Sequence, residues 1–118
     1  MIAAEELKFK LTNIADLIHN IIAETDDVPY NEFTKNEQLK ERVFSQLQEI
    51  GQSANEISAS LNEYEDEDKN KDILDNLSRF SNARFNQEAE IDLNSVWNII
   101  QTEFREIEKE LMTTAKKY

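Results

Sequence analysis

Apolar residues recur at steps of three and four along most of this chain, the spacing that places them on one face of an α-helix. The most regular run covers residues 39–61, where apolar residues at 39, 43, 47, 50, 54, 57 and 61 follow one another at steps of four or three. Comparable runs cover 7–21, 73–80 and 96–111. The pattern predicts four amphipathic helices, at about residues 4–24, 34–61, 73–85 and 93–116.

The chain has 118 residues with a single glycine and a single proline, so it holds little of the turn chemistry that β-hairpins require. We therefore expect an all-α fold. Four amphipathic segments with short connections favour an antiparallel four-helix bundle, and the length suits one domain, residues 1–118. The absence of cysteine and the single histidine exclude disulfides, a thiol nucleophile and a conventional zinc site.

Local signals set the expected helix boundaries. Pro29 cannot continue a helix and pushes Val28 out of the α region, so the first helix should end before them. Thr34 and Glu37 have capping-box spacing, which predicts the start of the second helix. Asp92 can cap the fourth helix.

Gly51, the only glycine, lies in the middle of the second predicted helix. A glycine there costs about 1 kcal/mol relative to alanine. It can reflect neutral drift, or the close approach of another helix backbone that a side chain would prevent. The regular apolar pattern around Gly51 favours the close approach.

The formal net charge of -12 and the pI of about 4.4 argue against broad, non-specific binding to nucleic acid, which normally uses a basic face. They do not exclude a small local anion site. No apolar run approaches the roughly 20 residues of a membrane helix. The opening MIAAEELKFK has two glutamates where a secretory signal needs a basic segment. We expect a cytoplasmic protein that does not enter membranes.

The acidic stretch at residues 62–72 is typical of a solvated connection between helices. Its acidic and amide side chains between positions 66 and 72 imitate the first ligands of a calcium loop. Lys71 stands where that loop needs its turn glycine, and Leu77 where it needs its bidentate glutamate. We therefore expect no metal site and no cofactor.

The stretch LSRFSNARFN, residues 77–86, places Arg79 and Arg84 among small polar residues in this acidic chain. Forked guanidinium groups bind phosphate well. Two such arginines are, however, more often ordinary surface charges that pair weakly with nearby carboxylates. The residues by themselves leave both interpretations open.

Three segments of the chain resemble, in the same order, the HepT type of HEPN-domain proteins, the toxin half of bacterial toxin–antitoxin pairs. LKERVFSQLQEIGQSANEIS resembles the family's second helix, with Ile-Gly-Gln-Ser-Ala at 50–54 where the family favours Ile-Gly-Glu-Ala-Ala. IDLNSVWNIIQTEFREIEKEL is similar to its last helix, and PYNEFTKNEQLKERV to the loop that enters the second helix. The resemblance implies the HEPN fold and a two-fold homodimer.

The family's catalytic signature is an arginine, four to six spacer residues and a histidine, commonly with a tyrosine two residues after the histidine. Arg79 matches the arginine. Four spacers later, Arg84 stands at the histidine position and Asn86 at the tyrosine position, and longer spacers reach only Phe85 or Asn86. Phe80 also replaces a polar residue that often follows the family's arginine. The resemblance therefore implies a degenerate site made of Arg79, Arg84 and Asn86.

The family consists of metal-independent endoribonucleases, in which a 2′-hydroxyl attacks the neighbouring phosphate. This reaction needs a proton acceptor, a proton donor and cationic support for the developing charge. Histidine exchanges protons near neutral pH, whereas the guanidinium of Arg84 stays protonated at any physiological pH. Losing general acid–base help costs typically about 10²–10⁴-fold in rate. The resemblance thus implies a weak or inactive ribonuclease.

The expected positions of the motif residues, of His19 and of Trp97 bear on whether the chain is an active ribonuclease. On a continuous α-helix, Arg79 and Asn86 would share one face, whereas Arg84 would lie on a different face from Arg79. His19, the only histidine, has apolar neighbours on the first predicted helix. We expect it to be a partly buried or rim residue rather than a catalytic substitute. Trp97 is expected to pack in the core or an interface rather than stack on a base.

The resemblance also implies partners. The family's homodimer brings its two motifs together across a shared cleft, and its cognate partner is a minimal nucleotidyltransferase antitoxin. That partner can nucleotidylate the tyrosine near the histidine, but Asn86 offers no hydroxyl to accept a nucleotide. Two other functions stay open. One is a non-catalytic helical dimer that binds a nucleotidyltransferase, nucleotide or RNA, and the other is a purely structural helical bundle.

Overall fold

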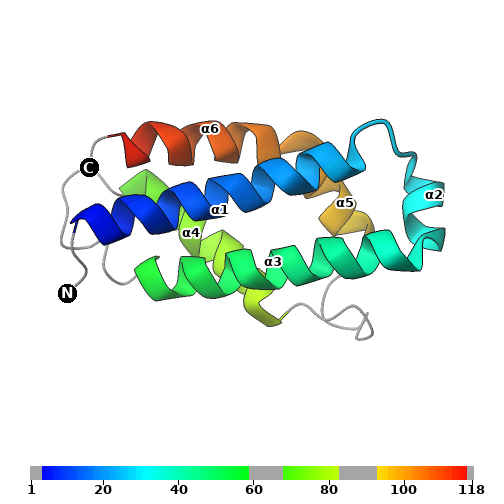
Figure 1. Cartoon of the computed structure of the whole chain (residues 1–118), viewed down its shortest axis with the longest axis horizontal. Helices are drawn as coiled ribbons and strands as arrows, with labels where there is room; N and C mark the ends of the chain where they lie inside the picture. Colours follow the sequence, from blue (N-terminus) through cyan, green and yellow to red (C-terminus); the bar gives the residue numbers. More distant parts are fainter. Residues whose placement is uncertain (1–3, 59–67, 83–92, 117–118) are drawn as a thin grey trace.

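The computed structural model describes residues 4–58, 68–82 and 93–116, and every regular element within these ranges is a helix (Figure 1). The all-α prediction is therefore confirmed for the described residues. The elements are α1 (Ala4–Thr25), α2 (Tyr30–Lys35), α3 (Glu37–Ser58), α4 (Asp68–Ser78), the 3₁₀ helix η2 (Arg79–Asn82), α5 (Leu93–Thr102) and α6 (Phe104–Ala115).

The helix α1 packs against α6 and against α3, and both neighbours run in the opposite direction to α1 (Figure 1). The helix α4 passes behind them at a steep angle and, together with η2, packs chiefly on α3. α2 packs against the beginning of α3. None of the helices in the described ranges is long and apolar enough to cross a membrane.

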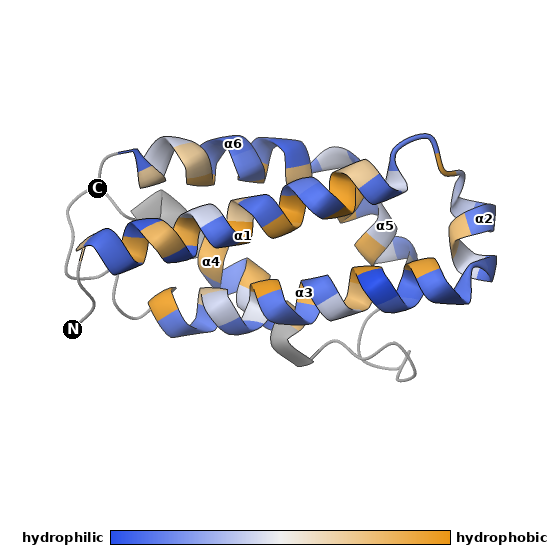
Figure 2. Cartoon of the chain, viewed as in Figure 1, coloured by the Kyte–Doolittle hydropathy of each residue, from blue (hydrophilic) through white to orange (hydrophobic). Residues whose placement is uncertain are grey.

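The apolar stripes predicted from the sequence form one shared core. Figure 2 shows hydrophobic and hydrophilic residues alternating around α1 and α3, as expected of helices with one buried side. Fully burying an aliphatic side chain contributes roughly 1.5–3 kcal/mol, so these stripes supply most of the drive for packing. The stripe residues with no exposed surface are Leu7, Leu11, Ile14, Ile18, Ile21, Val43, Leu47, Ile50, Ala54, Ile57, Leu74, Phe104 and Leu111.

The predicted end of α1 is confirmed within one residue, and a turn explains it. Asp27 has φ 62°, in the left-handed region that aspartate tolerates better than most residues. The backbone N–H of Val28 then donates to the carbonyl of Thr25 at 3.2 Å. The hydroxyl of Thr25, a buried side chain, donates to the carbonyl of Ile21 at 2.8 Å.

The predicted capping box at the start of the second helix is wrong. The chain instead forms the short helix α2 directly after Pro29, and Asn36 then adopts an extended conformation before α3. The Oδ1 atom of Asn36 accepts a hydrogen bond from the backbone N–H of Leu39 at 3.0 Å, so Asn36 caps α3. The hydroxyl of Thr34 donates back to the carbonyl of Asn31 at 3.0 Å and belongs to α2.

The third predicted helix begins earlier than expected and changes geometry before its expected end. Its α-helical part starts at Asp68, inside the acidic stretch predicted as a connection, and ends at Ser78. The 3₁₀ helix η2 follows, and the predicted residues from 83 to 85 lie outside the described part of the chain. The Ser78 hydroxyl donates to the carbonyl of Asp75 at 2.7 Å, a side-chain bond that competes with continued α-helix.

The fourth predicted helix is divided at Glu103 into α5 and α6. Backbone hydrogen bonding continues across the break, because the N–H of Glu103 donates to Ile99 and its carbonyl accepts from Ile107, both at 2.9 Å. The Thr102 hydroxyl donates to the carbonyl of Asn98 at 2.6 Å. Such back-bonding by threonine often bends a helix, so we attribute the break to Thr102. The proposed cap at Asp92 lies outside the described residues.

Gly51 is buried on α3, on the side that packs against α1, α4 and η2. A residue without a side chain is buried only when other groups cover its backbone. The burial of Gly51 therefore supports a close approach between helices rather than neutral drift.

We expect Gly51→Leu to lower the free energy of unfolding by about 1–3 kcal/mol, because the larger side chain overpacks a covered position. Leucine's higher helix propensity acts in the opposite direction. Urea denaturation followed by circular dichroism measures the change. Gln52→Leu, at the exposed neighbouring position, is the matched control and should change stability by less than about 0.5 kcal/mol. A neutral Gly51→Leu would contradict the close approach.

Asn36→Ala should destabilise the protein by about 1 kcal/mol, because the N–H of Leu39 loses its acceptor at the first turn of α3. Thr34→Ala is the control, since Thr34 does not cap α3, and it should have the smaller effect. The same denaturation experiment compares them. If Thr34→Ala were the more harmful change, the cap would be the one predicted from sequence.

Candidate functional site

Of the three predicted site residues, Arg79 lies in the described part of the chain, whereas Arg84 and Asn86 lie outside it. Arg79 is the first residue of η2, directly after α4, and its side chain is exposed. The next residue, Phe80, is only 7% exposed and belongs to the core. Phe80 thus anchors η2 in the core, while Arg79 beside it faces outward.

The expectation that Arg79 and Asn86 share one helix face rested on a continuous α-helix. From Arg79 to Asn82 the chain is instead 3₁₀, with about three residues per turn rather than 3.6. The described residues therefore do not support the expectation that Arg79 and Asn86 share one helix face.

Arg79 lines a hollow of about 250 Å³ between α4–η2 on one side and α5–α6 on the other. A second hollow of about 210 Å³ adjoins it, because both are lined by Ile73, Glu103 and Ile107. Glu106 and Glu110 also line the second hollow. The described residues that line the first hollow are Ile73, Asn76, Leu77, Arg79, Phe80, Ile99, Glu103 and Ile107.

Among the described lining residues, the balance of charge in these two hollows is opposite to the one expected of an anion site. Arg79 shares its hollow with the carboxylate of Glu103, and the adjoining hollow adds the carboxylates of Glu106 and Glu110. A single guanidinium beside several carboxylates attracts phosphate less than an isolated cation does, because the fields of opposite charges partly cancel.

Sequence reasoning missed Glu103 and its neighbours. Positions 103, 106 and 110 are separated by three and four, so their spacing indicates one shared helix face. The sequence does not reveal that this face borders the helix that carries Arg79. That information comes from the packing of α4 beside α6.

His19 is exposed, with 69% of its side chain accessible, so of the two expected positions, partly buried or at the rim, the structure excludes the partly buried one. Its Nδ1 atom lies 3.2 Å from each carboxylate oxygen of Glu108 and so connects α1 with α6. The described lining of the Arg79 hollow does not include His19. Trp97 packs as expected: it is buried, with ring centroids 4.7 Å from Phe33 and 5.9 Å from Tyr30.

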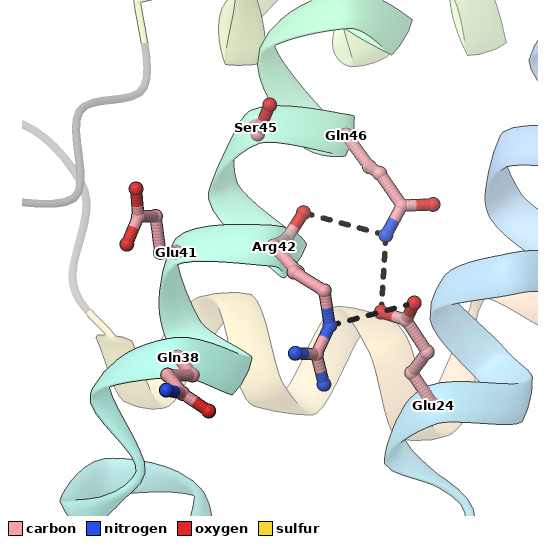
Figure 3. A pocket seen from close by; sticks show the side chains of 6 residues that line it. All are labelled: Glu24, Gln38, Glu41, Arg42, Ser45 and Gln46. Carbon is pink, nitrogen blue, oxygen red and sulfur yellow. Dashed lines mark hydrogen bonds and ion pairs between the residues drawn. The ribbon is translucent and has the colours of Figure 1, made fainter.

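A larger hollow, of about 530 Å³, lies between the end of α1 and the first half of α3 (Figure 3). Glu24 from α1 meets two side chains of α3 there. Its Oε1 atom lies 3.8 Å from Nε of Arg42, and its Oε2 atom accepts a hydrogen bond from Nε2 of Gln46 at 3.1 Å. Gln46 also donates to the carbonyl of Arg42 at 3.3 Å. These contacts join α1 to α3.

The described lining of the larger hollow includes no evident catalytic group. Ser45 lines it, but the other described lining residues are carboxylates, amides and Arg42, with no histidine to act as a base. Within the described ranges, no three histidine, aspartate or glutamate side chains lie together as ligands for a metal ion.

The comparisons with known proteins identify one family. A family model described as Ribonuclease HepT-like matches residues 13–114, from the middle of α1 to the end of α6, including the stretch that follows Arg79. No curated protein and no solved structure matches the chain. Since the family model covers most of the 118 residues, the chain belongs to the HepT-like ribonuclease family.

Proposed function

We propose that this chain is the HepT-like component of a toxin–antitoxin-type system and that its metal-independent ribonuclease activity is weak or absent. The observation that carries the proposal is the family match over residues 13–114. The sequence resemblance, on which the loss of activity rests, aligns Arg84 with the histidine of the motif. An arginine holds a phosphate but cannot accept its proton near neutral pH.

The surroundings of Arg79 support the same conclusion. Arg79 is exposed and therefore accessible to a phosphate, as the charge-stabilising role requires. Glu103 lines the same hollow, however, and reduces the positive potential there. His19, which could supply a proton-transfer group, is paired with Glu108 on α6.

The acidic lining favours, as a second candidate function, a non-catalytic role. In that case the chain is a helical dimer that binds a nucleotidyltransferase, nucleotide or RNA and performs no chemistry. RNA cleavage by the wild-type protein that disappears with Arg79→Ala would exclude this alternative.

We further propose the assembly and setting that accompany this function. The helices α1, α3, α4–η2 and α5–α6 form an antiparallel four-helix bundle, and two chains associate through the side of η2 that carries Arg79. Such a dimer brings two copies each of Arg79 and Arg84 into one cleft. Its partner is a cytoplasmic minimal nucleotidyltransferase, which cannot modify position 86, because Asn86 has no hydroxyl.

Light scattering at micromolar concentration should give the mass of two chains. The physical reason is that, among the described elements, α4 and η2 pack chiefly on α3 and α4 has only a small contact with α6, which leaves part of their surface for a second copy. A monomer at this concentration would remove the composite cleft and, with it, the pairing of the two motifs.

Arg84→His should measurably raise metal-independent cleavage of a labelled single-stranded RNA in the presence of a chelator. The substitution restores a group whose pKa lies near neutrality five positions after Arg79. Full recovery would be about 10²–10⁴-fold. We expect a partial gain, because Phe80 and Asn86 also depart from the motif and leave the imidazole less precisely oriented.

The double variant Arg84→His, Arg79→Ala is the control and should lose the gain, since the charge stabiliser is gone. Efficient cleavage by the wild type, unchanged by loss of both arginines and by His19→Ala, would place the active site elsewhere and contradict the proposal.

A further inference from the structure

The two adjoining hollows between α4 and α6 form one continuous groove, because they share three lining residues. We call it the α4–α6 groove, lined by Ile73, Asn76, Leu77, Arg79, Phe80, Ile99, Glu103, Glu106, Ile107 and Glu110. Arg79 and Ile99 of α5 line only the first hollow, so Arg79 lies at the α5 end of the groove.

The floor of the α4–α6 groove is apolar and incompletely covered. Ile73, Ile99 and Ile107 are only half-buried, although they pack against the fully buried core. Each hollow is several times larger than the roughly 30 Å³ that one water molecule occupies in the liquid. There is therefore room for aliphatic side chains from another molecule, which would gain stability by covering these isoleucines.

The rim of the groove carries negative charge along α6. Glu103 and Glu106 are exposed and lie on the same side of the helix, since they are three residues apart. Glu110, one turn further, also lines the groove, but this residue already has an interaction partner. An apolar floor flanked by the carboxylates of Glu103 and Glu106 matches a helix with apolar residues on one face and cations beside them.

The carboxylates of the groove favour some binding partners over others. RNA would bring phosphates against Glu103 and Glu106, which repel them. A second copy of this chain, which the proposed dimer places on the exposed side of η2, has 13 lysines and arginines against 25 acidic residues and offers few cations to the carboxylates of the groove. A basic segment is attracted by the rim and by the whole acidic protein.

We propose that the α4–α6 groove binds a basic amphipathic helix of a protein partner. Its apolar residues cover Ile73, Ile99 and Ile107, and its lysines or arginines pair with Glu103 and Glu106. The inference rests on the proposed function only for the existence of a protein partner and does not require RNA cleavage. Occupation of the groove also places the partner beside Arg79, so binding restricts access to that residue.

A synthetic peptide tests the groove without knowledge of the natural partner. The probe is an N-acetylated, fluorescently labelled peptide of about 15 residues, made of leucine, lysine and alanine, with leucines at helical spacing on one face. Binding to the full chain is measured by fluorescence anisotropy. A scrambled peptide of equal composition lacks the apolar face, and a peptide with glutamate for every lysine lacks the charge. Both should bind at least tenfold more weakly.

Two matched pairs of variants locate the binding site. Glu103→Lys with Glu106→Lys should raise the dissociation constant at least tenfold, whereas Glu41→Lys with Glu49→Lys makes the same charge change on α3 and should have little effect. Ile73→Ala should weaken binding about fivefold, unlike Ile22→Ala, which shortens a half-buried isoleucine of α1 outside the groove. Circular dichroism confirms that each variant is folded.

Three outcomes would overturn the inference. Equal binding of the ordered and scrambled peptides, or equal effects of the two charge reversals, would indicate attraction to the net charge alone. Loss of dimer mass with Glu103→Lys and Glu106→Lys, without any peptide binding by the wild type, would assign the groove to a second copy. RNA cleavage assays are separate, so a failure of the ribonuclease proposal leaves a positive peptide result intact.

Discussion

The burial of one apolar side of α1 between α3 and α6 is the interaction on which the remaining structure depends. Five residues of that side have no exposed surface, which fixes both neighbouring helices against α1. With α3 held in place, α4 and η2 can add their buried residues to the same core. The position of Arg79 is thus set by packing that begins with α1 and α3. The residues with no exposed surface in α1 are Leu7, Leu11, Ile14, Ile18 and Ile21.

Much of the fold could be predicted because helical periodicity reports directly which residues become buried. The same periodicity does not identify local competitors for backbone hydrogen bonds. Asn36, rather than Thr34, caps α3, and the hydroxyl of Thr102 accompanies a break that the apolar pattern crosses without interruption. Helix ends and breaks depend on single hydrogen bonds worth about 1 kcal/mol. The pattern of apolar residues does not reveal where these hydrogen bonds form.

The candidate site was predictable only in part. The resemblance singled out Arg79, Arg84 and Asn86, and the structure describes Arg79 as an exposed residue at the start of η2. Its proximity to Glu103 could not be predicted, because the two residues come from segments that the sequence does not relate. Spacing along one helix determines a face, whereas the partner of that face follows from how all the helices pack.

The buried ring of Phe80 has a consequence for its exposed neighbour. Because residue 80 is fixed in the core, the backbone of Arg79 is held in place, and only its side chain remains to be ordered when a ligand arrives. Immobilising one long side chain costs about 0.5–1.5 kcal/mol, whereas ordering a loose backbone would add about 1–2 kcal/mol for each residue. The buried phenylalanine therefore makes this arginine a preorganised contact, with a smaller entropic penalty for whatever it binds.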